Sequence, residues 1–122
     1  MANNIPLAIS MALLVMVFMS VTADSIPCHK IETMLQGCVG YVQTGGAVVP
    51  PQCCEGMKDL KKVNKNAHNR FTSCKCIKRL VNKIPGAHKD LVEGIPKKCN
   101  VDIGLPLDLS ASCSKYVLYH SA

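Results

Sequence analysis

The sequence contains no tryptophan and only two phenylalanines and three tyrosines among its 122 residues. A hydrophobic core of this chain must therefore consist mainly of valine, isoleucine, leucine and methionine. The few aromatic residues are also not interleaved with the basic ones, as they are on many nucleic-acid-binding surfaces. Together with the export signal described below, this absence argues against nucleic acid as a partner.

The sequence also lacks the short motifs of common catalytic sites. It has no G-x-S-x-G, no phosphate-binding loop and no G-x-G-x-x-G, and most of its few carboxylates neighbour lysines. The histidines are scattered, without the paired spacing of a metal site: His29, His68, His88 and His120. We therefore expect no enzyme, no catalytic residue, no cofactor and no bound metal.

One long apolar run lies near the start of the chain. It extends from Leu7 to Met19, and Val21-Thr22-Ala23 follows it with the small-residue spacing of a signal-peptidase site. The run is shorter than the roughly 20 residues that span a bilayer, which weakens the alternative of a membrane anchor. We expect a signal peptide over residues 1–23 and one secreted, extracellular domain over residues 24–122.

The net charge is +6, and every charged residue lies after the predicted cleavage point. A basic exported protein suits anionic partners such as phospholipid head groups, cell-wall polymers of the apoplast or microbial surfaces. Four lysines share one face of a predicted helix: Lys58, Lys61, Lys62 and Lys65. A second helix carries Lys75, Lys78 and Arg79. Each group is either a solvated surface or a docking face for an anionic membrane or wall polymer.

All eight cysteines also follow the cleavage point, at positions 28, 38, 53, 54, 74, 76, 99 and 113. An even number in a small exported domain predicts four disulfides, and the chain has no C-x2-C pair that would favour zinc. On a helix, adjacent residues point about 100° apart and residues two apart about 200° apart. Cys53 and Cys54 must then reach different segments, as must Cys74 and Cys76. The spacing leaves the rest of the connectivity open.

Apolar residues recur at three- and four-residue steps and predict an all-α domain. The first helix has Ser25 as its cap and Pro27 in its first turn, and it ends at Gly45-Gly46. The other three cover roughly 52–64, 69–83 and 87–94. From Val101 to Leu109 the apolar residues alternate instead, with Gly104 and Pro106 between them. A lone strand has no partner here, so we expect an extended C-terminal arm over the helices.

The interior can be interpreted in two ways. Four crosslinks reduce the need for a tightly filled core, so a shell of aliphatic residues could surround an apolar hollow. Protein interiors usually pack closely, however, and the same residues could simply fill the middle. The residues alone do not decide between these alternatives.

The cysteine spacing, C-x9-C-x14-CC-x19-C-x-C-x22-C-x13-C, resembles the eight-cysteine pattern of plant non-specific lipid transfer proteins, type 1. Lys75 between two cysteines, Tyr41 and Leu60 also match recurrent positions of that family. The resemblance implies a four-helix, disulfide-stapled bundle with an extended arm around an apolar cavity for acyl chains. It also implies four disulfides: Cys28–Cys76, Cys38–Cys53, Cys54–Cys99 and Cys74–Cys113.

Two positions differ from the family pattern. An Asp-Arg pair precedes the C-x-C motif in the family, and its Arg contacts the lipid head group; this chain has Asn69 before Arg70. A family Tyr that helps to bind the polar end of the lipid falls on Leu105, or on Leu107 in an alternative alignment. The polar end of the cavity should therefore be weaker or differently built.

These observations predict a secreted, monomeric carrier of fatty acids and phospholipids, with Arg70 at the head group. The aliphatic residues expected to form the cavity wall are Ile31, Leu35, Leu60, Ile77, Val81, Ile95, Ile103, Leu105 and Leu107. A cationic defence protein that acts on membranes through its lysines is the alternative. A hydrolase inhibitor or storage protein is a third candidate, because related eight-cysteine folds serve both roles.

Overall fold

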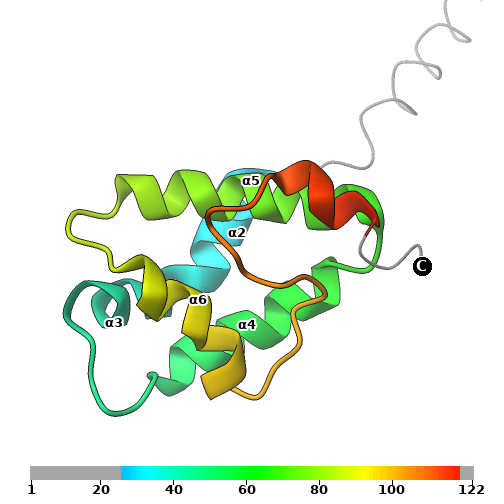
Figure 1. The fold of residues 1–122 in the computed structure, drawn as a ribbon. Helices are drawn as coiled ribbons and strands as arrows, with labels where there is room; N and C mark the ends of the chain where they lie inside the picture. The colour runs from blue at the N-terminus through cyan, green and yellow to red at the C-terminus, as the bar shows by residue number, and fades with distance from the viewer. Residues whose placement is uncertain (1–25, 119–122) are drawn as a thin grey trace, which may run out of the picture.

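The computed structural model describes residues 26–118, so the predicted signal peptide, its cleavage site and Ser25 lie outside the described residues. The described part is helical and contains no strand, which confirms the predicted all-α class (Figure 1). Its elements are α2 (Cys28–Leu35), η1 (Gln36–Cys38), α3 (Val39–Thr44), α4 (Pro51–Val63), α5 (Ala67–Lys83), α6 (Lys89–Lys98) and η2 (Cys113–Leu118).

The first predicted helix is broken in its middle. Pro27 is the extended residue before α2 rather than part of its first turn, and the 3-10 segment η1 separates α2 from α3. Gly37 in this segment lies against α4, where an added Cβ would come within 2.8 Å of the Gln52 Cβ. Close packing against α4 therefore sets the break, which apolar periodicity does not reveal. Gly45, at φ 76°, ends α3 as predicted.

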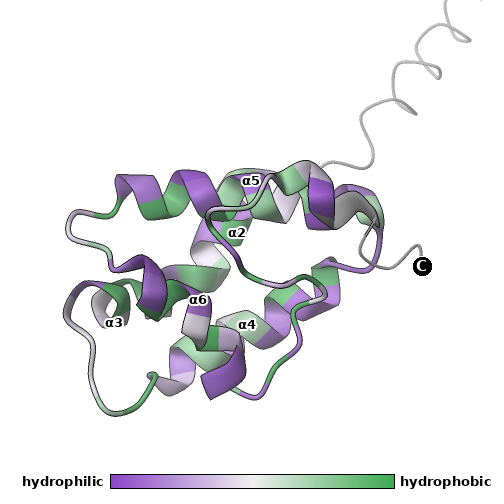
Figure 2. Ribbon diagram, viewed as in Figure 1, coloured by the Kyte–Doolittle hydropathy of each residue, from purple (hydrophilic) through white to green (hydrophobic). Residues whose placement is uncertain are grey.

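The boundaries of α4 and α5 lie within a few residues of the predicted ones. Pro51 occupies the first turn of α4, where its missing N–H leaves no helical hydrogen bond unmade. Asn66 caps α5, and its Oδ1 accepts a hydrogen bond from the Asn69 N–H at 2.8 Å. Both helices carry hydrophilic and hydrophobic residues along their length, as amphipathic helices do (Figure 2).

The fourth helix continues past its predicted end at Gly94. Pro96 lies inside α6, where it removes only the hydrogen bond to the Val92 carbonyl, and the helix extends to Lys98. A Schellman motif then ends it: Val101 donates to the Pro96 carbonyl at 2.9 Å and Asn100 donates to the Lys97 carbonyl at 3.1 Å. Asn100 has φ 55°, the left-handed conformation that this motif needs.

Four disulfides join these elements. Cys28–Cys76 links α2 to α5, Cys38–Cys53 links η1 to α4, Cys54–Cys99 links α4 to the end of α6, and Cys74–Cys113 links α5 to η2. These are the pairs that the resemblance implies, and no cysteine of the described residues is free. The arm between α6 and η2 crosses the helices in an extended path (Figure 1).

Helices α2 and α4 approach each other closely at Gly56. A Cβ added at this glycine would lie 1.9 Å from the Met34 carbonyl oxygen, so only glycine fits without movement of the backbone. Ile31, Cys53 and Leu60 are fully buried on either side of the contact. The contact thus fixes the distance between two of the helices that surround the interior.

We expect Gly56→Ala to lower the free energy of unfolding by about 2–3 kcal/mol, because the two backbones must separate to admit the methyl group. Gly94→Ala is the matched control, since nothing lies within 4 Å of its added Cβ and alanine favours the helix. Chemical denaturation of the oxidised proteins measures both. Equal stabilities for the two variants would contradict the close contact.

Candidate functional site

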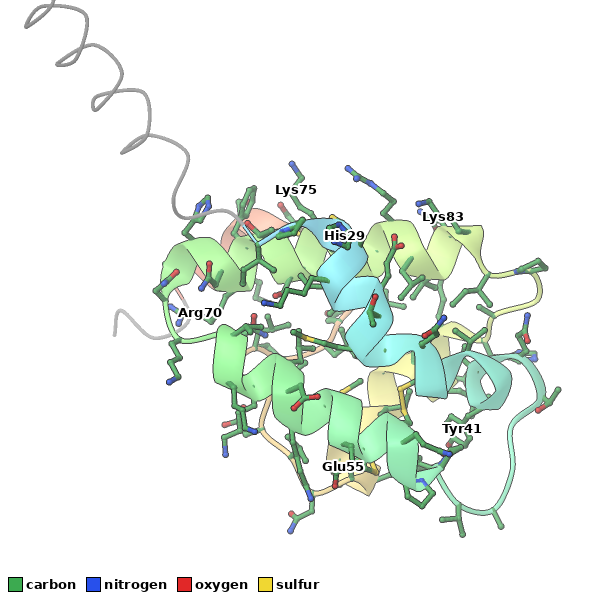
Figure 3. All side chains as sticks on the ribbon, turned by 180° about the vertical axis from the view of Figure 1, so that it is seen from behind. His29, Tyr41, Glu55, Arg70, Lys75 and Lys83 are labelled. Atoms are coloured by element: carbon green, nitrogen blue, oxygen red, sulfur yellow. A yellow bond between two sulfur atoms is a disulfide. The ribbon has the colours of Figure 1, made fainter. Side chains whose placement is uncertain are left out.

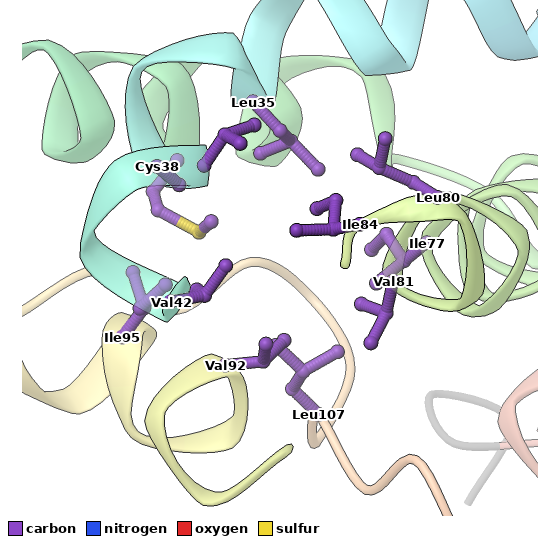
Figure 4. A pocket seen from close by; sticks show the side chains of 12 residues that line it. Leu35, Cys38, Val42, Ile77, Leu80, Val81, Ile84, Val92, Ile95 and Leu107 are labelled. Atoms are coloured by element: carbon purple, nitrogen blue, oxygen red, sulfur yellow. The ribbon is translucent and has the colours of Figure 1, made fainter. Parts of the chain in front are cut away.

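A narrow apolar pocket lies between the helices and the arm. Its empty volume is about 390 Å³ with its mouth included, but the centre of a water-sized sphere can reach only about 30 Å³ of it. Side chains from all the surrounding elements point toward this common space (Figure 4). Its lining is formed by Leu35, Cys38, Val39, Val42, Met57, Ile77, Leu80, Val81, Ile84, Val92, Ile95 and Leu107. The interior is therefore neither a wide hollow nor completely filled.

Helix α5 and the residue that follows its end contribute four of these residues. Ile77, Leu80 and Val81 lie on α5, with Leu80 and Val81 three and four residues after Ile77, and Ile84 is the C-cap residue of the helix. Cys74 and Cys76, one turn earlier, bond in different directions and hold this helix between α2 and η2. The wall thus stands on a helix whose position is covalently fixed.

Five of the nine residues predicted for the wall line this pocket: Leu35, Ile77, Val81, Ile95 and Leu107. The other four do not line it but are packed in the core beside it, with 0–4% of their surface exposed: Ile31, Leu60, Ile103 and Leu105. Val42, Leu80, Ile84 and Val92 were missed, although they stand at helical spacing from predicted residues. Contact of any of these side chains with a lipid stays a prediction.

Arg70 lies away from the pocket, in the first turn of α5. It precedes Ile77 by seven residues, or about 10 Å along the helix, and Figure 3 shows it at the opposite end of α5 from Lys83. Only 5% of its surface is exposed, and its buried Nε has no hydrogen-bond partner within the described residues. A buried Nε without a partner is costly, which makes this side chain a candidate for binding an anion.

Two residues beside Arg70 are uncharged. Asn69, at the position where the related pattern has an acid, donates from Nδ2 to the Val63 carbonyl at 2.9 Å and so caps the end of α4. A carboxylate cannot make this donation. Gly104 of the arm lies on the other side, where an added Cβ would be 3.9 Å from the Arg70 Cδ. Asparagine therefore replaces the expected charge with a structural hydrogen bond.

The arm is fastened to the helices by buried polar groups. Asn64, 4% exposed, donates from Nδ2 to the Ile103 carbonyl at 2.9 Å, and its Oδ1 accepts from the Ser73 hydroxyl at 2.5 Å. Further along, the Glu93 carboxylate accepts from the Leu109 N–H at 2.7 Å, and Lys78 donates to the Ala111 carbonyl. These bonds hold the arm in place on both sides of Leu107.

Hydrogen bonds also order a turn of the arm beyond Leu107. The Ser110 hydroxyl and N–H donate to the Asp108 carboxylate at 2.6 and 3.0 Å. These two bonds lower the pKa of the Asp108 carboxyl, because they stabilise its charged form. The turn leads directly into the Ala111 contact and the disulfide at Cys113.

Two other kinds of feature are absent from the described residues. No helix among them is long and apolar enough to cross a membrane, and they contain no cluster of three or more metal-ligating side chains.

Comparison with known proteins agrees with this geometry. The model of the protease inhibitor, seed storage and LTP family matches residues 17–117, so the chain belongs to that family. Within it, the chain is similar to the non-specific lipid-transfer protein of Malus domestica, at 35% identity over 105 residues, which cover 85% of this chain and 90% of that protein. It is also similar to a stigma/stylar cysteine-rich adhesin of Lilium longiflorum, at 40% identity over 103 residues, covering 84% and 90%.

Solved structures of lipid transfer proteins share the fold. Barley non-specific lipid transfer protein 1, in complex with a lysophosphatidylcholine, matches with a TM-score of 0.66 at 29% identity, covering 74% of this chain and 98% of that one. A wheat non-specific transfer protein with two phospholipid molecules matches with a TM-score of 0.67 at 30% identity, covering 74% and 99%. The predicted four-helix fold and the resemblance to lipid transfer proteins are thereby confirmed.

Proposed function

We propose that this chain is a lipid carrier that binds fatty acids and phospholipids reversibly in the apolar pocket. The observation that carries the proposal is a pocket without a polar lining residue, inside a shell fixed by four disulfides. The barley and wheat relatives, which hold phospholipids, support it. Carriage requires only binding and release, so the proposed function involves no catalysis.

The size of the pocket bears on how a lipid enters. A space of about 30 Å³ for the centre of a water-sized sphere holds only a couple of waters, so an acyl chain must displace side chains of the wall. Burial contributes about 0.8 kcal/mol per methylene and depends little on the chemical type of the chain. We therefore propose that the carrier tolerates different acyl chains.

Arg70 is proposed to hold the phosphate of a phospholipid that extends to its end of the molecule. A charge-assisted hydrogen bond would satisfy the Nε that has no partner now. Ile31, Leu60 and Leu105 fill the interior beside the pocket and are proposed to move aside for such a ligand. The neutral Asn69 leaves the charge of Arg70 available to it.

The carrier is proposed to act outside the cell as a monomer, after removal of residues 1–23. The apolar run, the small residues before position 24 and the four disulfides together support export to an oxidising compartment such as the cell wall. We also propose that the exposed lysines bind an anionic membrane or wall polymer. A defence role on microbial membranes would use the same surface.

The four lysines predicted to share one helix face support this second candidate only in part, because α4 ends at Val63 and Lys65 lies beyond it. Lys58 is 3.2 Å from Glu55 and Lys62 is 3.9 Å from Asp59, whereas Lys61 and Lys65 form no salt bridge within the described residues. Exposed pairs of this kind are weak, so an anionic surface can compete for the paired lysines as well. The lily relative, which is named an adhesin, agrees with a surface-binding role.

We expect Val92→Phe to weaken fatty-acid binding at least about tenfold, because the added ring occupies the space that the acyl chain needs. Displacement of a fluorescent fatty acid measures this, and circular dichroism and a denaturation curve verify the fold. Val48→Phe is the matched control, since Val48 is 77% exposed and lies outside the pocket. Unchanged binding by folded Val92→Phe would refute the pocket as the acyl site.

Arg70→Gln should weaken binding of palmitoyl lysophosphatidic acid about tenfold while leaving binding of the uncharged cetyl alcohol unchanged, because the alcohol has no charge to pair. The control is Arg79→Gln, at an exposed arginine on the same helix. If Arg70→Gln affects both ligands equally, the side chain has a structural role only.

Charge reversal at Lys61 and Lys65 should lower association with vesicles containing phosphatidylserine at least about tenfold, since each lysine contributes about 1 kcal/mol near an anionic surface. Binding of fatty acid in solution should not change. Lys30→Glu with Lys97→Glu reverses two other exposed lysines and controls for net charge. Equal losses in the two pairs would show that net charge, and not the positions of Lys61 and Lys65, determines association.

A further inference from the structure

A second cleft adjoins the apolar pocket at the opposite end of α5 from Arg70. It is lined by Lys78, Val81, Asn82, Lys89 and Leu109, and the centre of a water-sized sphere can reach about 160 Å³ of it. Val81 lines both the cleft and the pocket. On the arm, Leu107 lines the pocket and Leu109, two residues later, lines the cleft. The cleft therefore lies beside the pocket and gives it a polar neighbour.

Two ammonium groups give the cleft a positive charge. Lys78 donates to the Ala111 carbonyl, which uses one of its three N–H donors and fixes the ammonium group beside the arm. Lys89, the first residue of α6, is exposed, and neither lysine forms a salt bridge within the described residues. Asn82 adds a side-chain amide that can donate as well.

The acidic groups near the cleft do not cancel this charge. Glu93 accepts from the N–H of Leu109, Asp90 follows Lys89 in the chain, and Asp108 precedes Leu109 with its carboxylate bonded to Ser110. Glu93 uses this oxygen to hold the arm, and none of the three acids forms a salt bridge with Lys78 or Lys89 within the described residues. Two cations thus line a cleft whose own lining contains no carboxylate.

The position of the apolar pocket favours this cleft over Arg70 as the polar end of the pocket. Arg70 precedes Val81 by eleven residues on α5, or about 16 Å, and Ile103 and Leu105 are buried near its end of the molecule. The apolar pocket lies beside the later half of α5, next to Val81, which it shares with the cleft. An acyl chain in the pocket therefore adjoins the two cations of the cleft.

We propose that Lys78 and Lys89 hold the carboxylate of a fatty acid whose chain occupies the apolar pocket. The inference rests on the proposed lipid-carrier function and adds the orientation of the ligand, with its charged end between α5, α6 and the arm. It also assigns a preference for anionic over neutral single-chain lipids to Lys78, which the sequence predicts only as part of a basic face, and to Lys89, which no sequence pattern marks.

The test compares palmitate with cetyl alcohol in displacement assays on the oxidised protein, residues 24–122. Wild type, Lys89→Gln and the Lys78→Gln/Lys89→Gln double variant are measured alongside Lys30→Gln/Lys97→Gln, which removes two exposed lysines outside the cleft. We expect the double variant to lose roughly fivefold to tenfold in palmitate affinity, and Lys89→Gln to lose part of that, with cetyl alcohol unaffected. The control pair should retain wild-type affinity for both ligands.

The outcomes separate the two levels of the proposal. If wild type binds both lipids and the cleft variants keep its ratio of palmitate to alcohol affinity, the assignment of the head group is overturned while the carrier function stands. A loss for both lipids in Lys89→Gln likewise overturns it, since Lys89 makes no salt bridge that its removal would break. If folded wild type binds neither lipid, the carrier function itself fails.

Discussion

The covalent attachment of α5 on two sides is the constraint on which the rest of the structure depends. Cys76 joins it to Cys28 of α2, and Cys74 joins it to Cys113 of η2, across 48 and 39 residues of sequence. In the loop-entropy model, a disulfide that closes a loop of this length raises the free energy of the unfolded chain by an amount on the order of 3–4 kcal/mol. Because the disulfides supply this stability, the interior does not need to be densely packed. The apolar pocket can therefore persist beside α5.

Much of the fold follows from local patterns in the sequence. The helical recurrence of apolar residues from Cys74 to Val81 predicts α5. The alternation of apolar residues after Val101 predicts the extended arm. The break at Gly37 and the continuation of α6 through Pro96 are different, because they depend on packing against Gln52 and on a Schellman motif at Asn100. Tertiary contacts of this kind leave no periodic signal.

The candidate site was less predictable than the fold. Wall residues such as Ile77 and core residues such as Ile31 lie on the same inner faces of their helices, so periodicity cannot separate them. The difference lies in how tightly neighbouring side chains fill the space, which only the three-dimensional arrangement shows. Resemblance to a family supplied the expectation of a cavity and marked Arg70, but not its lack of a partner or the role of Asn69 in capping α4.

The fastening of the arm makes one boundary of the pocket different from the others. Helical walls are joined to one another by disulfides, whereas Leu107 stands on a segment held at Ile103 and at Leu109 by single hydrogen bonds to Asn64 and Glu93. Gly104, with φ 86°, lies just after the first of these attachments. The mechanical compliance of the pocket is therefore concentrated in the arm, and its capacity can change while the helical frame keeps its dimensions.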